Sequence, residues 1–202
     1  MTDQELKRIK READLFREID ILDYIDEMMP WNKHINYSIK RFSELMDKTE
    51  APYALIGEYA LNFYHVPNFV GEIAYSIKGL DLKQLSDSLE RSGFRRLAYS
   101  SGRLALLDLQ VNIPLTIYNE PEPLRWDDEM SSRLMRAKIG TKLLSPEDYA
   151  IFLILRNGSR EIELAAKILY LNLDVVDRDY LIRRSREYNL SKVVSELLGK
   201  IS

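Results

Sequence analysis

The side chains that could do chemistry in this chain are mainly carboxylates. Cysteine is absent, and His34 and His65 are the only histidines. This excludes disulfides, thiolate metal sites, cysteine nucleophiles and a histidine-rich metal centre. Asp108 lies among leucines in a strand-like segment, where we expect it to be buried. A buried carboxylate is usually paired or functional, so Asp108 is a candidate site residue.

Several familiar nucleotide-binding and catalytic patterns are missing from the sequence. It contains no Walker-type or Rossmann-type glycine pattern and no Gly-x-Ser-x-Gly elbow. Basic residues cluster at Arg95-Arg96, at 183–186, and at a third place formed by Arg133, Arg136, Lys138 and Lys142. Each cluster fits a solvated face, and the third could also hold phosphates.

Length and composition predict a folded protein with a sizeable core. The chain has 202 residues, of which 46% are hydrophobic and 30% charged, with a net charge of −3. A mildly acidic whole argues against wholesale electrostatic binding of nucleic acid. No apolar run approaches a membrane span and the first residues form no signal region, so we expect a cytoplasmic protein with no membrane contact. Rare glutamine with abundant charge favours a thermophile.

The chain begins with a predicted helical extension. Apolar residues spaced by threes and fours predict one long helix over residues 1–29, ended by Pro30, and a second helix over 35–48. The apolar stripe of the first helix runs from Leu6 to Ile25 and could pack on its own domain. Because its spacing is partly heptad-like, it could instead bind a protein partner or a second copy of the chain.

At about residue 52 the helical period gives way to alternation. Tyr53–Ile56 is a short apolar run ending at Gly57, which predicts a buried strand entering a turn. The elements predicted after it are a short helix over 58–64, a strand over 72–78, a helix over 82–92, and strands over 95–99, 103–110 and 111–118.

The rest of the chain is predicted to be helical. Ser145-Pro146-Glu147-Asp148 combines a cap, a proline at the first position and acids in the first turn. The predicted fold class is α+β, a mixed β-sheet with helices. The predicted domains are an N-terminal helical extension (1–50), an α/β core (51–125) and a C-terminal helical bundle (126–202).

Two parts of the sequence resemble the DNA polymerase β-type nucleotidyltransferase superfamily, especially its small prokaryotic and AbiEii-like members. In that family a strand ends in Gly-Gly or Gly-Ser, a short helix follows, and the next strand carries Arg-x-Thr-x-Asp-x-Asp. Leu55–Ile77 has this order and spacing. Leu144–Ala150 resembles the family's Ser-Pro-Glu-Asp helix start, and Arg160–Ala165 resembles its Arg/Lys-Asp-x-x-Asp-Ala segment with both acids changed to Glu.

The resemblance implies a nucleotidyltransferase-like core that holds Mg²⁺ with carboxylates. It places Glu72 at the first carboxylate and makes Asp108 the best candidate for the third, so these two are the candidate catalytic and metal-binding residues. It makes Gly57 and Glu58 the candidate phosphate-binding residues, because the glycine turn brings N–H groups and a helix N-terminus to the triphosphate.

The sequence departs from the family pattern at the positions that matter for catalysis. Ala74 occupies the second carboxylate position, and alanine binds no metal. Asn68 stands where a basic residue is expected, and Val70 where a threonine is expected. Glu58 replaces the second turn glycine, and its carboxylate would repel a triphosphate. Two carboxylates alone leave a two-metal site short of ligands.

We therefore expect a degenerate active site and a non-catalytic binding or regulatory role. The expected ligand is a nucleotide, a nucleic acid or a protein, and no cofactor is needed. One alternative is an active Mg²⁺-dependent nucleotidyltransferase that uses Glu72 and Asp108, and another is a structural oligomer built on the N-terminal helix. Gly57 also fits an ordinary turn, Glu72 fits a solvated strand residue, and His65 fits a packing or capping role.

Overall fold

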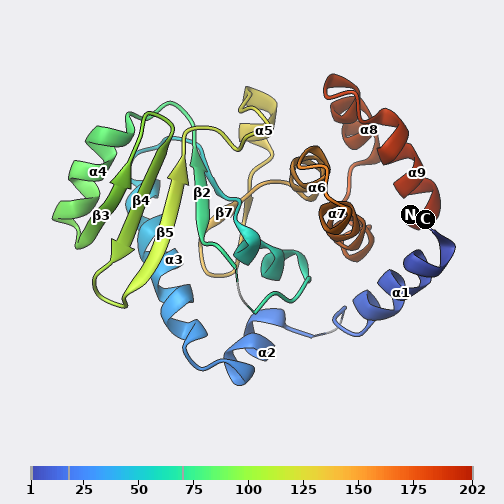
Figure 1. Ribbon diagram of the computed structural model, residues 1–202, viewed down its shortest axis with the longest axis horizontal. Coiled ribbons are helices and arrows are strands. Elements are labelled where there is room, and N and C mark those ends of the chain that lie inside the picture. The colour runs from blue at the N-terminus through green and yellow to red at the C-terminus, as the bar shows by residue number, and fades with distance from the viewer. Residues whose placement is uncertain (1, 18, 70, 202) are drawn as a thin grey trace. The chain divides into compact units, whose positions relative to one another are not determined.

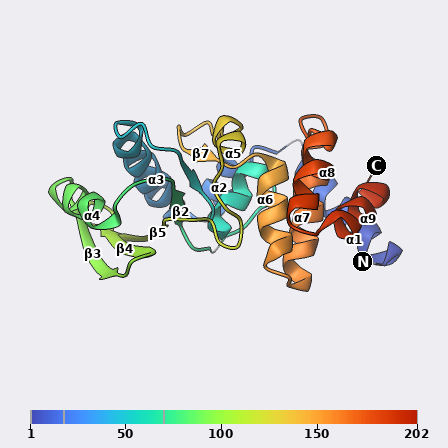
Figure 2. The ribbon, with the colours of Figure 1, turned by 90° about the horizontal axis from the view of Figure 1, so that it is seen from above.

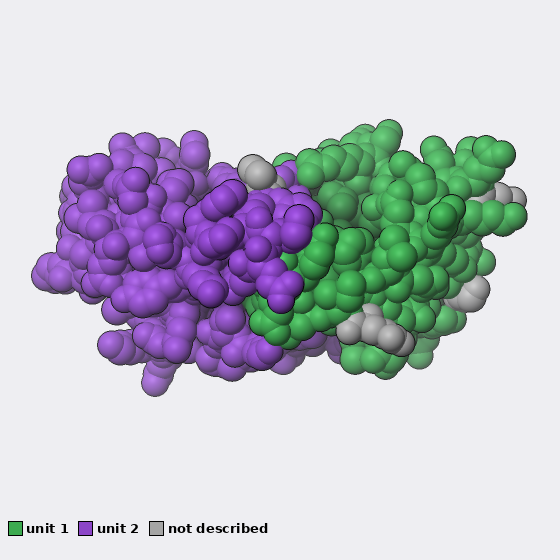
Figure 3. Space-filling view, turned by 90° about the horizontal axis from the view of Figure 1, so that it is seen from below, with its two compact units in different colours: residues 1–24, 61–67, 145–202 green, residues 25–60, 68–144 purple. Residues whose placement is uncertain are grey.

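The chain forms two compact units, each assembled from segments that are distant in the sequence (Figures 1 and 3). The computed structural model describes residues 2–17, 19–69 and 71–201. Unit 1 contains residues 1–24, 61–67 and 145–202, and unit 2 contains residues 25–60 and 68–144. Helix α2 (Ile21–Met28) and the 3₁₀ helix η1 (Glu58–Tyr64) each contribute residues to both units.

Unit 2 is built around a seven-stranded mixed sheet, and the predicted α+β class is confirmed. Its strands, in the order β3-β4-β5-β2-β1-β7-β6, are β3 (Phe94–Tyr99), β4 (Arg103–Asp108), β5 (Ile113–Tyr118), β2 (Ala74–Ile77), β1 (Tyr53–Leu55), β7 (Lys142–Leu143) and β6 (Met135–Arg136). β1 runs antiparallel to β2, and β2 runs parallel to β5. The predicted strands are present. β2 is shorter than the predicted strand over 72–78, since it begins after Glu72.

Two helices of unit 2 lie on the same side of the sheet (Figure 2). They are α3 (Asn32–Asp47) and α4 (Leu82–Arg91). The ring centroid of Phe42 in α3 lies 4.3 Å from that of Tyr75 in β2 and 6.3 Å from that of Phe94 in β3. A short helix, α5 (Asp128–Ser132), follows β5. The aromatic contacts make α3 part of the core of unit 2.

Unit 1 is helical. Its helices are α1 (Asp3–Asp14), α6 (Pro146–Leu155), α7 (Ser159–Leu171), α8 (Arg178–Glu187) and α9 (Ser191–Ile201). α1 packs on α7, with Ile9 and Ala13 buried. In the part of the chain that the structure describes, no helix has the length and apolar character needed to cross a membrane.

The prediction of one long helix over residues 1–29 is wrong. α1 ends at Asp14 and α2 begins at Ile21. The Asp20 carboxylate accepts hydrogen bonds from the amides at positions 22 and 23, at 3.1 and 3.3 Å, and so caps α2. The apolar spacing runs on across the break, which is why periodicity alone did not reveal it.

The predicted domain boundaries at residues 50 and 125 differ from the division into units. α3 belongs with the sheet, and β6 and β7 extend that sheet beyond residue 125. α1 belongs with the C-terminal helices, and residues 61–67 join them although they were predicted in the α/β core. Contacts between distant segments decide this division.

Candidate functional site

The turn after β1 is hydrogen-bonded to the backbone of β2. The amides of Ile56 and Gly57 both donate to the carbonyl oxygen of Ala74, at 2.7 and 3.1 Å. The amide of Tyr59 donates to the carbonyl oxygen of Glu72 at 3.4 Å. These three backbone donors of the predicted phosphate-binding turn are therefore used within the protein.

Close packing requires glycine at position 57. A Cβ atom on Gly57 would lie 2.1 Å from the carbonyl oxygen of Glu72 and 2.7 Å from the amide nitrogen of Ala74. Both distances are far below a van der Waals contact, and both partners are backbone atoms that cannot swing away. Gly57 lets the turn approach β2, which is the ordinary turn role that the sequence left open.

Glu58 and the segment before β2 form the outer side of this turn. The side-chain amide of Asn68 donates to the carbonyl oxygen of Glu58 at 3.3 Å. A Cβ atom on Gly71 would lie 2.8 Å from the Cβ of Glu58, so this segment also packs closely. Asn68 holds the loop through a neutral hydrogen bond. Val70, at the predicted threonine position, lies outside the described residues.

Asp108 is completely buried, as predicted, and hydrogen bonds from the protein surround it. One carboxylate oxygen accepts a hydrogen bond from the Ser38 hydroxyl at 3.0 Å. The other accepts from the Arg41 guanidinium and from the Gln110 amide, the latter at 3.0 Å. Ser38 and Arg41 both come from α3. The carboxylate therefore joins α3 to the end of β4.

Glu72 lies at the surface just before β2 and contacts β5. Its Oε1 accepts a hydrogen bond from the Tyr118 hydroxyl at 3.4 Å. Burial, followed by the nearby Glu72 carboxylate, raises the pKa of Tyr118. The hydroxyl therefore stays protonated at neutral pH and remains a donor to Glu72. Exposed Arg103 is the cross-strand neighbour of Tyr118 and completes a small polar group on this face.

Glu72 and Asp108 lie on opposite faces of the sheet. Asp108 pairs with Ile113 of β5 and faces α3. Side chains alternate between faces along a strand, so Tyr118, five positions after Ile113 in an unbroken register, faces away from α3. Glu72 contacts Tyr118 and shares its face. The structure does not bring the two candidate metal ligands together.

The residues present do not fit the two-metal site that the resemblance implies. Across residues 2–17, 19–69 and 71–201, no three Asp, Glu, His or Cys side chains gather where they could hold an ion. Ala74 pairs with Thr116, and both are buried. Ser76 lies two positions farther along β2, and its hydroxyl accepts a hydrogen bond from the Trp126 indole N–H at 2.7 Å. Small and neutral side chains thus follow Glu72 on this face of β2.

The structure contains the predicted strand, glycine turn, short helix and second strand in this order. Neither a protein-family model nor a curated protein matches the chain. The relationship to the nucleotidyltransferase superfamily stays a prediction.

Part of the basic cluster at 133–142 is neutralised inside unit 2. Arg136 and Lys142 lie 3.0 and 3.6 Å from the carboxylate of Asp47 in α3. Burial favours the neutral acid, but hydrogen bonds from Arg136 and Tyr53 hold the pKa of Asp47 below its ordinary value. Asp47 therefore stays charged and ties β6 and β7 to α3. This pairing leaves less charge for a phosphate than the sequence suggests.

The Ser145–Asp148 motif starts α6 as predicted and also builds a buried polar cluster in unit 1. The Ser145 hydroxyl accepts a hydrogen bond from the Asp148 amide at 3.2 Å. The Asp148 carboxylate accepts from the Tyr180 hydroxyl at 2.8 Å and from Arg184 Nε at 3.3 Å. Burial is the largest influence on this carboxyl group and raises the pKa of Asp148.

Glu147 extends the same cluster to the start of α8. Its Oε1 accepts a hydrogen bond from the Asp177 amide at 2.5 Å, and Asp177 caps α8 through the Tyr180 amide. Together the two motif acids fix α6 to α8. The motif therefore has a structural explanation within unit 1.

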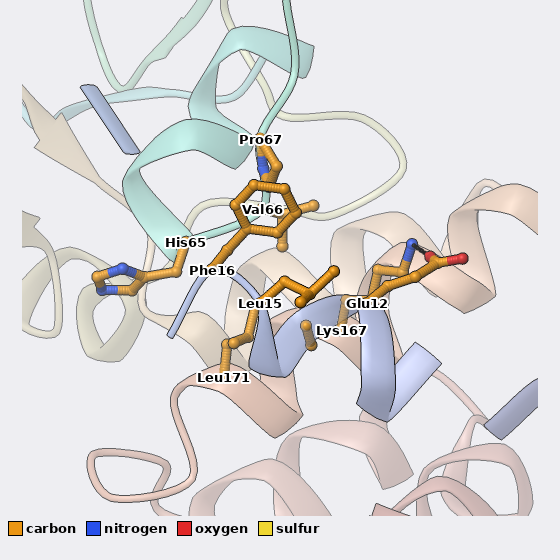
Figure 4. A pocket seen from close by; sticks show the side chains of 9 residues that line it. Glu12, Leu15, Phe16, His65, Val66, Pro67, Lys167 and Leu171 are labelled. Carbon is orange, nitrogen blue, oxygen red and sulfur yellow. Dashed lines mark hydrogen bonds and ion pairs between the residues drawn. The ribbon is translucent and has the colours of Figure 1, made fainter. Parts of the chain in front are cut away.

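A pocket of about 260 Å³ lies between α1, α7 and the end of η1 in unit 1 (Figure 4). Its lining is mostly apolar, and Lys167 forms an ion pair with Glu12 at 2.8 Å. His65 projects away from the other labelled side chains (Figure 4). Its backbone is left-handed, with φ of 63°, where the Val66 amide bonds back to Leu61. His65 thus ends η1 through its backbone.

Sequence reasoning did not find the residues that complete these sites. Arg41 and Ser38 come from a helix that was predicted in a different domain from Asp108. Tyr118 and Trp126 gave no motif signal. Arg184 lay in a basic cluster that fitted a solvated face, but only 4% of this residue is exposed. The one available signal was Asp108 itself, because a carboxylate among leucines requires a partner.

Proposed function

We propose that this chain is a non-catalytic binding protein built on a nucleotidyltransferase-like core, and that its ligand is a protein. The observation that carries the proposal is the bonding of the Gly57 turn to the β2 backbone. A phosphate cradle needs backbone N–H groups directed at the ligand. Here the amides of Ile56, Gly57 and Tyr59 are directed at carbonyl oxygens instead.

The bonding of Asp108 supports the same proposal. To bind a metal ion, this carboxylate would have to leave Arg41, whose side chain is only 13% exposed. Removing one partner of a buried ion pair costs about 3–5 kcal/mol, because the other charge stays behind. The alternative of an active enzyme that uses Glu72 and Asp108 has to meet this cost and also has to bring the two side chains to one face.

The choice of a protein ligand rests on the surface of unit 2. Two large apolar side chains, Met28 and Trp31, are 60% and 58% exposed. Exposed aromatic and Met side chains are enriched in protein interfaces. By contrast, Arg136 and Lys142, which could attract a phosphate, are paired with Asp47. These observations favour protein over nucleotide or nucleic acid.

Calorimetric titration tests the proposal, with Mg²⁺ and ATP as the first probe and a single-stranded oligonucleotide as the second. We expect no saturable heat from either probe. A matched titration of Glu72→Gln shows whether any heat of binding depends on this candidate metal ligand. The exposed side chain can be changed without disturbing the fold. Saturable binding of Mg²⁺ and ATP that Glu72→Gln weakens would contradict the proposal. Saturable binding of the oligonucleotide would replace the protein ligand with nucleic acid.

A further inference from the structure

The corner between α2 and α3 carries two large apolar side chains in water. α2 ends at Met28 and α3 begins at Asn32, and this corner is visible in Figure 1. Met28 and Trp31 are 60% and 58% exposed, whereas Ile25 and Met29 beside them are buried. Tryptophan is highly buried on average, and this exposed tryptophan stands close to exposed Met28, so the corner is a candidate binding surface.

A hydrogen-bond network holds this corner rigid. The Asn32 and Asn36 side-chain amides donate to the Asp26 carboxylate, at 2.5 and 3.3 Å. The Tyr59 hydroxyl lies 2.7 and 2.8 Å from the two asparagine oxygens. Trp31 is therefore presented from a fixed backbone, which lowers the entropy lost when it is bound.

An apolar pocket reaches α3 at Ile35, four residues after Trp31. It has a volume of about 200 Å³ and is lined mainly by apolar residues from α3, the segment before β2 and the start of β5, including Ile35, Ile73, Ile113 and Pro114, and Glu72 is the one charged residue among the described residues that line it. Trp31 has helical backbone angles, φ −70° and ψ −12°, so Ile35, four positions later, lies on the same side of the helix. A projecting ring and an apolar hollow are thus neighbours on one surface.

Two exposed charges of opposite sign flank Trp31 in the sequence. Glu27 and Lys33 are exposed on either side of it in the sequence, and neither forms an ion pair with any residue that the structure describes. In a two-fold dimer, every contact occurs twice: if residue i of one copy contacts residue j of the other, then residue j of the first copy contacts residue i of the second. Glu27 of each copy can therefore face Lys33 of the other.

We propose that this corner is a homodimer interface, in which Trp31 of each copy enters the pocket beside Ile35 and Ile113 of the other copy. The inference rests on the proposed function, because both use exposed Trp31, and it names the protein ligand as a second copy of the chain. The two tests remain distinguishable: a chain that stays monomeric contradicts only the dimer, and saturable binding of Mg²⁺ and ATP contradicts only the non-catalytic role. The apolar surface is small, which places the interface at the low end of the usual size range. We expect a dimer with a dissociation constant on the order of micromolar.

Sedimentation velocity on the full chain over a concentration series tests the dimer. The wild-type chain should shift from monomer to dimer as concentration rises. Trp31→Asp should raise the dissociation constant at least about 30-fold, the effect of losing a hot-spot side chain. Val175→Asp is the matched control, since Val175 is 59% exposed and belongs to unit 1; this variant should dimerise like wild type. Circular dichroism checks that each variant is folded.

Charge reversal supplies a second test that leaves Trp31 in place. Glu27→Lys and Lys33→Glu should each weaken the dimer, and the double variant Glu27→Lys/Lys33→Glu should restore it. A wild-type chain that stays monomeric would overturn the proposal and leave the surface to a different protein. A dimer that survives both Trp31→Asp and the single charge reversals would also overturn it, because the interface would then lie elsewhere.

Discussion

The amide nitrogen of Gly57 lies 3.1 Å from the carbonyl oxygen of Ala74. Gly57 belongs to the turn in which the resemblance predicts a phosphate site, and Ala74 stands where it predicts a metal ligand. The predicted phosphate-binding turn and the predicted metal-binding strand are therefore joined by a backbone hydrogen bond. The turn lies so close to β2 that a Cβ atom at position 57 would meet the backbone of Glu72 and Ala74, which explains the glycine at this position.

Gly57→Ala should lower the free energy of unfolding by about 1–3 kcal/mol or more, the usual penalty for overpacking a core. The added Cβ would meet the backbone oxygen of Glu72 at 2.1 Å, and backbone cannot move aside easily. Gly102→Ala is the control, because a Cβ there meets no atom within 4 Å. Urea denaturation measures both variants. Equal stability of Gly57→Ala and wild type would show that the turn does not pack on β2 in this way.

Asp108→Ala should destabilise unit 2 by about 3–5 kcal/mol, because it leaves the guanidinium of Arg41 without its buried partner. Asp128→Ala is the control. Its carboxylate is bonded to Lys78 but fully exposed, so we expect little change in stability. Thermal and urea unfolding report the difference. If Asp108→Ala unfolds at the same denaturant concentration as wild type, the carboxylate has no structural role.

Ile9→Ala should destabilise unit 1 by about 2–5 kcal/mol, because Ile9 is completely buried where α1 packs on α7. Leu15→Ala, at the end of the same helix, removes a side chain that is 66% exposed and should have little effect. Equilibrium denaturation compares the two. Equal effects of both substitutions would mean that α1 is not held by unit 1 in solution.

The buried Asp148 should make stability depend on pH in a direction opposite to that of most carboxylates. Burial raises its pKa in the folded state above the unfolded value. The folded state therefore binds more protons between these two values, and the contribution of Asp148 to stability falls as pH rises through that window. Asp148→Asn removes the titration while keeping the shape.

Unfolding of wild type and Asp148→Asn should be compared over a series of pH values. The stability of wild type minus that of the variant should be greatest on the acid side and should decrease as pH rises. An increase of this difference with pH would show that Arg184 and Tyr180 outweigh burial and lower the pKa of Asp148.

Much of the fold followed from local patterns. The change of period near residue 52, the strand ending at Gly57 and the helix start at Ser145 are all present in the structure. Each depends on residues within one element: alternation, a glycine turn, a capping serine followed by proline. The burial of Asp108 was also predictable, since its neighbours in β4 are apolar.

The parts that could not be predicted depend on contacts between distant segments. α1 joins α7 through Ile9, Ala13 and an ion pair between Arg8 and Glu163, which no local pattern indicates. The break before Asp20 was hidden because apolar residues keep helical spacing across it. The opposite orientations of Glu72 and Asp108 depend on strand register, which is fixed only when β4 pairs with β5.

A nucleotidyl-transfer assay tests the central claim most directly. Wild-type chain is incubated with Mg²⁺ and α-labelled nucleoside triphosphates, and release of pyrophosphate and labelling of acceptors are followed, with Glu72→Gln and Asp108→Asn measured beside it. We expect no turnover above the background of the two variants. Turnover by wild type that both substitutions abolish, while Glu72→Gln leaves the fold intact, would contradict a non-catalytic role.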